Sequence, residues 1–298
     1  MSIVDQIIEK GIPYRRSGDG VLVHCPFHDD STPSMWITRD NFAYCFGCGW
    51  SRKVDSFPEL GLNGSYPARR NGSVKRKPRQ PPPAGLDEDA HMDLMSRPEK
   101  LEYLLGRGIA MESIVEYRLG YTDAGFMVRP RYSIPVYGMN GELINMKFRA
   151  DPSIEEAGTG FKYISYPGAL PYVFNAHRVN RDQPLVCVGG ELDCIVAHQC
   201  GLNAISPMSE SIERDPLIRT LFPDQPVIVL FDKDEAGIKH GMRAERLLGK
   251  PVIHAVWPHP AEWGEDLSDI YLRLGKEYIV HVVERLGLYL RSHPKGWW

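Results

Sequence analysis

Hydrophobic residues in the second half of the chain form short continuous runs that alternate with stretches of helical periodicity. The apolar runs lie at 185–189, 203–206, 227–231 and 252–257, and the helical stretches at 191–198 and 238–248. A run of this length, rich in Val, Ile and Leu, is typical of a strand buried on both faces. Strands and helices alternating at this spacing predict right-handed crossovers and a mostly parallel α/β sheet.

Two aspartates directly follow the third of these runs. Asp232 and Asp234 stand at the carboxyl end of 227–231, where ligands bind in open α/β sheets. If the chain stayed extended, carboxylates two residues apart would point the same way and offer one hard cation two oxygen ligands. A strand followed by an acidic turn is the alternative, and Asp-x-Asp alone does not decide between them.

The middle of the chain, 96–180, has the mixed pattern of an α+β region. Residues 98–118 contain two helical stretches with a break at 106–108, and two strand-like runs are joined by the hairpin signal Asn140-Gly141. Further on, apolar residues recur at helical spacing over 276–291 and predict an amphipathic helix that packs on the sheet or on a partner. Trp297 and Trp298 follow it, and we expect them at the surface.

The first 60 residues contain two pairs of potential metal ligands. Cys25-x-x-His28 is followed, after sixteen residues, by Cys45-x-x-Cys48. Each pair forms a chelating knuckle, and two knuckles complete the tetrahedral N/S shell that Zn²⁺ prefers. His24 is a competing ligand, disfavoured because it adjoins Cys25.

Strand-like alternation at 34–37 and 42–44 predicts a small β-rich ribbon between these knuckles, with a core too small to fold without the metal. Exposed Trp36 and Tyr44, with basic neighbours, would stack on and pair with single-stranded nucleic acid. The basic neighbours are Arg39, Arg52 and Lys53. The alternative is that these aromatic rings only cap the metal core.

Residues 61–95 form a predicted basic, Pro-rich linker. Gly, Asn, Ser, Pro and basic residues dominate 61–83, and the loss of apolar periodicity predicts a flexible tether. Its basic residues either contact phosphates or keep the linker solvated. The chain of 298 residues has a net charge of −3, so any attraction to nucleic acid must come from such local patches.

The sequence also predicts a cytoplasmic protein without membrane contact. No apolar run is long enough to span a bilayer, and the amino terminus lacks the regions of a signal peptide. Cys187, Cys194 and Cys200 fall among apolar residues, as reduced core thiols do.

Both knuckle segments resemble a known family. CPFHDDSTPSM followed by YCFGCGW is similar to the zinc-binding domain of DnaG-type DNA primases, and this resemblance implies Cys25, His28, Cys45 and Cys48 as the zinc ligands. LLGRGIAMESIVEYRLGY and IPVYGMNGELINMKFR resemble the amino-terminal half of the primase RNA-polymerase core. In that family basic residues of this half line a groove for template and triphosphates, which implies the candidates Arg129, Arg131, Lys147, Arg149 and Lys162.

The order of strands and helices, with Asp-x-Asp after the third strand, resembles the Toprim fold of these primases. The resemblance implies a catalytic site of Asp232, Asp234, Glu191, Asp193 and Asp266, with Mg²⁺ or Mn²⁺ held by Asp232, Asp234 and Asp266. One position departs from the family, because VCVGGELDC places Gly189 where a glutamate is expected as base or metal ligand. Three explanations remain open. The change inactivates the site, Glu191 takes over the role, or the three aspartates and their metals carry the mechanism alone.

These features together predict a multidomain α+β protein. Its parts are a zinc ribbon (1–60), the linker (61–95), the amino-terminal subdomain of a primase core (96–180), a Toprim domain with a mostly parallel α/β sheet (181–275), and a carboxy-terminal helix and tail (276–298). The resemblance implies a DNA primase, a DNA-directed RNA polymerase that makes short RNA primers on single-stranded DNA from ribonucleoside triphosphates by metal-dependent nucleotidyl transfer. A template-binding or replication-loading protein with a lapsed catalytic core is the alternative.

The chain most resembles the primase half of bacteriophage primase-helicase proteins. It contains no GxxxxGK[ST] loop, so a P-loop helicase is not part of it. We therefore expect a separate replicative helicase and a DNA polymerase as partners, in the host cytoplasm if the protein is phage-encoded.

Overall fold

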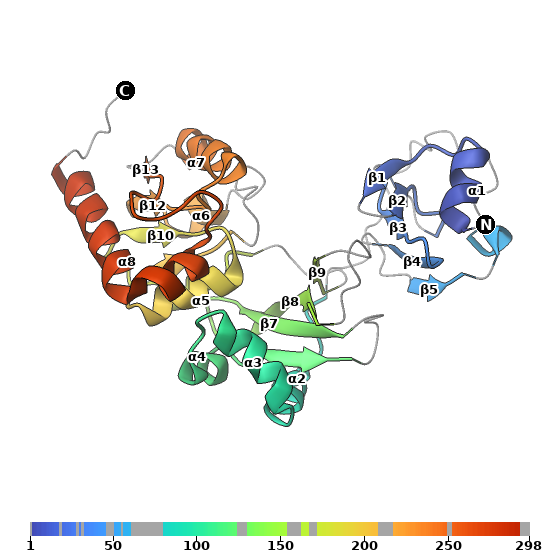
Figure 1. Ribbon diagram of the computed structural model, residues 1–298, viewed down its shortest axis with the longest axis horizontal. Coiled ribbons are helices and arrows are strands. Elements are labelled where there is room, and N and C mark those ends of the chain that lie inside the picture. Colours follow the sequence, from blue (N-terminus) through green and yellow to red (C-terminus); the bar gives the residue numbers. More distant parts are fainter. Residues whose placement is uncertain are drawn as a thin grey trace. The chain divides into compact units, whose positions relative to one another are not determined.

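Two compact units make up the chain in the computed structural model (Figure 1). One comprises Met1–Pro83, Thr122–Ser133 and Met146–Leu170, and the other Ala84–Tyr121, Ile134–Asn145 and Pro171–Trp298. The structure describes residues 2–17, 20–27, 30, 33–45, 51–54, 56–60, 80–123, 130–153, 162–166, 172–207, 217–248 and 252–292. The predicted five-part division of the chain stays a prediction.

A five-stranded sheet forms the amino-terminal ribbon, and its strands pair antiparallel in chain order. They are β1 (Arg15–Ser17), β2 (Gly20–Val23), β3 (Met35–Ile37), β4 (Phe42–Cys45) and β5 (Ser51–Lys53). Helix α1 (Ile3–Glu9) begins at a capping box in which Ser2 and Asp5 satisfy each other's backbone N–H groups. The 3-10 helix η1 (Phe57–Leu60) follows β5. The predicted β-rich ribbon is confirmed.

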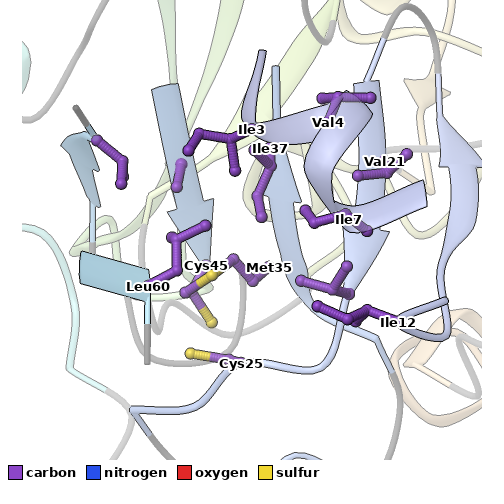
Figure 2. Packing of buried hydrophobic residues seen from close by; sticks show 13 residues of the cluster. Ile3, Val4, Ile7, Ile12, Val21, Cys25, Met35, Ile37, Cys45 and Leu60 are labelled. Carbon is purple, nitrogen blue, oxygen red and sulfur yellow. The ribbon is translucent and has the colours of Figure 1, made fainter. Parts of the chain in front are cut away.

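One apolar core lies between α1 and one face of this sheet (Figure 2). Ile3, Val4 and Ile7 of α1 belong to the same buried cluster as Met35 and Ile37 of β3. The cluster holds Cys25 and Cys45 as well, at the end of the sheet where β2 and β4 finish. So small a core gives limited stability, and a bound metal would add to it.

Trp36 and Tyr44 lie opposite each other on the other face of the sheet, and both are buried. Only 7% of Trp36 and 6% of Tyr44 is exposed, and the Trp36 indole donates a hydrogen bond to the carbonyl of Ser17 (3.2 Å). The prediction that these rings are exposed for stacking on nucleic acid is therefore wrong, because alternate residues of β3 and β4 point to a second face that is also covered. The basic residues predicted beside them, Arg39, Arg52 and Lys53, are exposed.

Three helices open the second unit: α2 (Leu86–Met95), α3 (Pro98–Gly106) and α4 (Met111–Glu116). The chain between α3 and α4 turns at Arg107-Gly108, as predicted, and Gly108 has a φ of +80°. Helix α2 corrects the extent of the linker, since its ten residues fall inside 61–95. Acidic residues in its first turn favour a helix there. The stretch 61–79 lies outside the described residues.

The four strands β6 (Gly120–Thr122), β7 (Arg131–Tyr137), β8 (Leu143–Ala150) and β9 (Tyr163–Ser165) form a second sheet in that order. The predicted Asn-Gly hairpin joins β7 to β8: Gly141 has a φ of +81°, and the Gly138 amide donates to the Glu142 carbonyl (2.8 Å). Strand β9 runs antiparallel to β8. The 3-10 helix η2 (Ala176–Arg178) follows later in the chain.

A parallel sheet contains the strands β10 (Leu185–Cys187), β11 (Ala204–Ile205), β12 (Val227–Val229) and β13 (Val252–His254), in the order β11-β10-β12-β13. The chain between these strands contains α5 (Glu191–Gln199), α6 (Leu217–Leu221) and α7 (Glu235–Leu248). All residues of the central strands β10 and β12 are buried, which explains their uninterrupted apolar runs. The predicted α/β sheet with parallel strands is confirmed.

Helix α8 (Leu267–Ser292) completes the fold and is interrupted at Gly275, where φ is +81°. Its second part is the predicted helix 276–291, and Ile279, Val282 and Val283 are buried there. The helix contacts α5, β12 and β13. Of the two predicted alternatives, packing on the sheet or on a partner, the structure shows packing on the sheet. Trp297 and Trp298 lie outside the described residues. Within the described part of the chain, no helix combines the length and the apolar character needed to cross a membrane.

The three thiols expected in the core, Cys187, Cys194 and Cys200, are buried and form no disulfide. Burial raises the pKa of Cys187 to about 12 and that of Cys200 to about 11. Both therefore stay protonated and unreactive at neutral pH.

Candidate functional site

Cys25 and Cys45 meet at one end of the ribbon core. Both thiols are buried, neither forms a disulfide, and Figure 2 shows their sulfur atoms at the same end of the cluster. The Phe27 amide lies 3.4 Å from the Cys25 sulfur and donates to it, which favours the thiolate. Two buried sulfurs with such a donor fit Zn²⁺. The other two predicted ligands, His28 and Cys48, lie outside the described residues.

The competing candidate His24 has a hydrogen-bond partner of its own. Its Nδ1 lies 2.9 Å from the backbone carbonyl oxygen of Asp30. This contact ties the ring to the loop that follows the first knuckle. The histidine therefore has a structural role at this position that does not require a metal.

The acidic turn after β12 begins α7. The Asp234 amide donates to the Asp232 carbonyl (2.9 Å), and Asp234 Oδ1 accepts from the Gly237 amide (2.6 Å), as an N-cap does. The chain is therefore not extended here, so the condition for two carboxylates pointing the same way is not met. Both side chains are half-exposed at the carboxyl end of the sheet, where a ligand can reach them.

A second segment holds this turn in place. Lys233 donates its backbone N–H to the Glu265 carbonyl (2.9 Å) and accepts at its own carbonyl from the Gly264 amide (2.8 Å). Its ammonium group donates to the Ala261 carbonyl (2.7 Å). The Asp-x-Asp turn is thus fixed to the loop that leads into Asp266 and α8.

Gly237 is required by close packing inside this turn. A Cβ at position 237 would overlap the carbonyl oxygen of Asp232. Helix propensity alone predicts that Gly237→Ala stabilises the protein by about 1 kcal/mol. We expect the opposite sign, a loss of about 1–3 kcal/mol in the free energy of unfolding, because the backbone must move. Denaturant titration measures it.

The matched control for this substitution is Gly287→Ala in α8, where the nearest atom to the added Cβ is the end of the Arg291 side chain at 3.8 Å. This variant should be neutral or more stable. Equal stabilisation by both substitutions would contradict the packing argument.

Arg107 joins two of the predicted catalytic carboxylates. Its Nη2 lies 2.8 Å from Asp266 Oδ2 and 3.9 Å from Asp193 Oδ1. Asp193 also accepts from the hydroxyl of Ser268 (2.5 Å) and from its amide (3.2 Å). Asp266 caps α8, because its Oδ1 accepts from the Asp269 amide (2.8 Å). Arg107 and Ser268 were not predicted as site residues.

The predicted magnesium ligands are therefore held in two groups. Asp232 and Asp234 occupy the turn before α7, whereas Asp266 pairs with Arg107. Among the residues that the structure describes, no three His, Cys, Asp or Glu side chains are grouped closely enough to hold a metal ion. Two half-exposed carboxylates do fit Mg²⁺, which is usually bound by one or two carboxylates together with substrate phosphates.

Burial determines the protonation of Asp193. Burial, with the neighbouring Asp266, raises the pKa of Asp193 to about 6, although Ser268 and Arg107 act against this. A raised pKa means that the folded protein keeps a proton which the unfolded chain releases. The free energy of unfolding should therefore fall as the pH rises from about 4 to about 6, and then level off.

Asp193→Asn should remove this part of the pH dependence, because the amide cannot ionise. Relative to wild type, the variant should gain about 1–3 kcal/mol between pH 4 and pH 7. Denaturant titrations at several pH values, without added magnesium, measure the difference. Asp182→Asn at an exposed position is the control. A wild-type-to-variant difference that stays constant over this range would refute the assignment.

Glu191 lies two residues after Gly189, the position where the resembled family has a glutamate. It is the first residue of α5 and only 1% exposed. Gly190 precedes it, and a Cβ there would lie 2.8 Å from Asp193 Oδ2. The glycine therefore lets the Asp193 carboxylate approach the backbone. The transfer of the base role from position 189 to Glu191 stays a prediction.

Three of the five predicted basic residues surround one aromatic ring on β8 and β9. Lys147 Nζ lies 4.8 Å from the centre of the Tyr163 ring, Lys162 Nζ 5.9 Å, and the Arg149 guanidinium carbon 5.8 Å. Lys162 is exposed and Lys147 half-buried, whereas Arg149 and Arg131 are buried. Arg129 lies outside the described residues. Tyr163 was not predicted, since nothing in the sequence marks it as the centre of this group.

Comparisons with known proteins agree with this architecture. Residues 1–62 match the CHC2 zinc finger family of the DnaG zinc ribbon. The DNA primase of Pseudomonas putida is 25% identical over 308 aligned residues, which cover 82% of this chain and 46% of the relative. The DNA primase of Clostridium acetobutylicum is 23% identical and covers 95% of this chain and 56% of its own length.

Solved structures show the same fold. The zinc-binding and RNA polymerase domains of the Aquifex aeolicus primase superpose with a TM-score of 0.56 at 20% identity, over 96% of this chain and 83% of that one. A DnaG primase catalytic domain bound to single-stranded DNA gives a TM-score of 0.52 at 18% identity, over 67% of this chain and 78% of that one.

An amino-terminal ribbon that matches a zinc finger family, followed by a parallel α/β sheet with an acidic turn, is the architecture that this chain shares with the solved primase structures. The family match, the relatives and the fold together show that the chain is similar to DnaG-type DNA primases. It spans about half the length of the curated relatives it matches.

Proposed function

We propose that the chain is a DNA primase that synthesises short RNA primers on single-stranded DNA from ribonucleoside triphosphates. The acidic turn at the carboxyl end of β12 is the observation that carries this proposal. Its half-exposed carboxylates, Asp232 and Asp234, stand at the edge of the sheet where α/β folds bind ligands. The zinc ribbon and the DNA primase relatives support the same activity.

In this proposal Asp232 and Asp234 hold Mg²⁺ or Mn²⁺. The metal, when bound, would lower the pKa of the primer 3′-hydroxyl and neutralise charge on the triphosphate. The chain's own part is to fix the carboxylates: Lys233 anchors their turn to the following loop, and the Gly237 amide orients Asp234. Asp266 is proposed as the third ligand, and in this structure it is paired with Arg107 instead.

The group that accepts the 3′-hydroxyl proton is the open part of this proposal. Gly189 supplies no side chain, and the carboxylate of Glu191 is buried. A mechanism carried by the aspartates and metals alone needs no protein base at either position, since the 3′-hydroxyl proton can pass to water, and we prefer it because Asp232 and Asp234 are less buried than Glu191.

The basic residues of β8, together with Lys162 just before β9, are proposed to hold phosphates of template or triphosphate. Lys147, Arg149 and Tyr163 share one face of the sheet, because residues 147 and 149 are two apart and Arg149 lies opposite Tyr163. Lys147 would neutralise a phosphate as a point charge, whereas Arg149 is buried beside the Tyr163 ring and donates to the Ala150 carbonyl. Lys162 adds an exposed cation beside the same ring.

Salt dependence tests this surface. We expect Lys147→Ala and Lys162→Ala to weaken the binding of single-stranded DNA and to reduce the slope of log K against log salt concentration by about 0.7 each. Fluorescence anisotropy at several salt concentrations measures both. Arg285→Ala, at an exposed position of α8, is the control. An unchanged slope in both lysine variants would exclude the surface from phosphate contact.

De novo primer synthesis tests the activity itself. The full chain, with zinc and Mg²⁺ or Mn²⁺, is incubated with labelled ribonucleotides on single-stranded templates of varied sequence. Labelled oligoribonucleotides that depend on template are the expected product. Their absence on every template would favour the alternative of a lapsed, template-binding protein, which the relatives do not favour.

The remaining partners are proposed on the same basis. A separate replicative helicase and a DNA polymerase would act beside this chain at the site of replication. A phage origin, with function in the host cytoplasm, stays a prediction.

A further inference from the structure

The carboxylate of Asp30 accepts hydrogen bonds from Cys25 and from Ser34, which lies beside Cys45. Asp30 Oδ2 accepts from the Cys25 amide (2.7 Å), the Ser34 amide (3.1 Å) and the Ser34 hydroxyl (2.7 Å). The same hydroxyl lies 3.4 Å from the sulfur of Cys45. A continuous path therefore leads from the backbone of Cys25 through Asp30 and Ser34 to the thiol of Cys45.

We propose that Asp30 and Ser34 are positioning residues for the zinc ligands Cys25 and Cys45. The inference rests on the proposed zinc site, because it assigns residues that would orient the metal's ligands. Neither residue was predicted from the sequence, where both fall between the two knuckles. Together they are called the Asp30–Ser34 relay below.

The sheet brings the relay to the right place. Val23 pairs with Met35, and Met35 pairs with Cys45, so β2, β3 and β4 are aligned at one end. Ser34 directly precedes Met35, and its amide also donates to the Val23 carbonyl (3.1 Å). Ser34 is therefore held between the strand that leads to Cys25 and the strand that ends in Cys45.

The chemistry of the relay suits a metal site. A carboxylate accepts several hydrogen bonds at once, so a single side chain can fix the backbone at Cys25 and the hydroxyl at Ser34. The serine hydroxyl can donate to a thiolate at Cys45 while its backbone N–H keeps the bond to Asp30. Residues of this kind fix the direction of first-shell ligands, and their loss typically weakens metal binding by about 10–100-fold.

Zinc affinity of the full chain tests the relay. Competition with a chromogenic chelator gives the dissociation constant for wild type, Asp30→Ala, Asp30→Asn and Ser34→Ala. Asp30→Ala should weaken zinc binding about 10–100-fold. Asp30→Asn should lose less, because its amide oxygen can still accept. Asp30→Glu should recover part of the loss, since it restores the carboxylate.

The matched control is Asp40→Asn in the exposed turn between β3 and β4, which should leave zinc affinity unchanged. Cobalt substitution adds a readout that a purely structural role would not change. In Ser34→Ala the sulfur-to-cobalt charge-transfer band should shift, because the hydroxyl beside Cys45 is gone.

The outcomes separate the relay from the zinc site itself. Unchanged zinc affinity in Asp30→Ala and Ser34→Ala would overturn the inference while leaving the zinc site intact. If Ser34→Ala weakens zinc binding but leaves the sulfur-to-cobalt charge-transfer band unchanged, the relay is only a packing element and the inference is again wrong. If Asp30→Ala does not fold, Asp30→Asn and Ser34→Ala decide, because Asn has the shape of Asp and Ala removes only the serine hydroxyl. A wild-type chain that binds no zinc would overturn both proposals.

Discussion

Replacing Asp232 by alanine is expected to reduce primer synthesis by on the order of 1,000-fold while template binding stays unchanged. Asp232 is half-buried at the end of β12 and is not one of the basic residues proposed to contact phosphates. Loss of one carboxylate from a two-ligand metal site removes several kcal/mol of charge stabilisation in the transition state, which corresponds to this factor. Labelled primer synthesis and DNA anisotropy on the same preparation measure the two effects separately.

The control for this variant is Asp224→Ala, an exposed aspartate shortly before the same strand. It changes the net charge equally and should retain full synthesis. Undiminished synthesis by Asp232→Ala with either Mg²⁺ or Mn²⁺ would remove the acidic turn from the mechanism. Loss of template binding together with synthesis would indicate misfolding, which thermal denaturation of the variant detects.

Cys45→Ser should unfold the amino-terminal ribbon. Structural zinc contributes about 10–16 kcal/mol in zinc-finger peptides, more than the small ribbon core can replace. The variant should bind less than stoichiometric zinc, and a protease should cut within residues 2–60 at concentrations that leave the wild type intact. Trp36 becomes a reporter, because its ring is buried in the folded ribbon.

Cys200→Ser is the matched control, since Cys200 is equally buried but belongs to the other unit. It should keep full zinc content and a protease-resistant ribbon. A Cys45→Ser protein with stoichiometric zinc and an intact ribbon would show that Cys45 is not a ligand.

The strands of the parallel sheet could be predicted because burial on both faces leaves an unmistakable pattern. Every residue of β10 and β12 is buried, so no polar position interrupts the apolar runs. The ribbon strands β3 and β4 could be located from their alternating pattern. The prediction that Trp36 and Tyr44 are exposed was wrong, because both are buried. Alternation states which residues share a face, and only the tertiary structure determines whether that face is covered.

In the candidate site, too, residues marked by their sequence neighbours could be predicted, and residues brought together from distant parts of the chain could not. Asp232 and Asp234 could be found because they directly follow an apolar strand. Arg107 could not, since 159 residues separate it from Asp266, and its sequence neighbours indicate only a break between helices. The Asp30–Ser34 relay was missed for another reason: no local pattern in the sequence shows that the Asp30 carboxylate accepts hydrogen bonds from Cys25 and Ser34.

The hydrogen bonds between Lys233 and the loop 261–265 determine which sequence changes the acidic turn can tolerate. Two of its three bonds to the loop 261–265 use backbone atoms, which every residue except proline supplies. Exchange of the side chain between the two aspartates would therefore leave them in place. The length of the loop is a stricter requirement, because one inserted residue would shift the carbonyl of Glu265 and the amide of Gly264 out of register with position 233. The spacing between the Asp-x-Asp turn and α8, more than the identity of the residue at 233, therefore sets where the proposed metal-binding carboxylates stand.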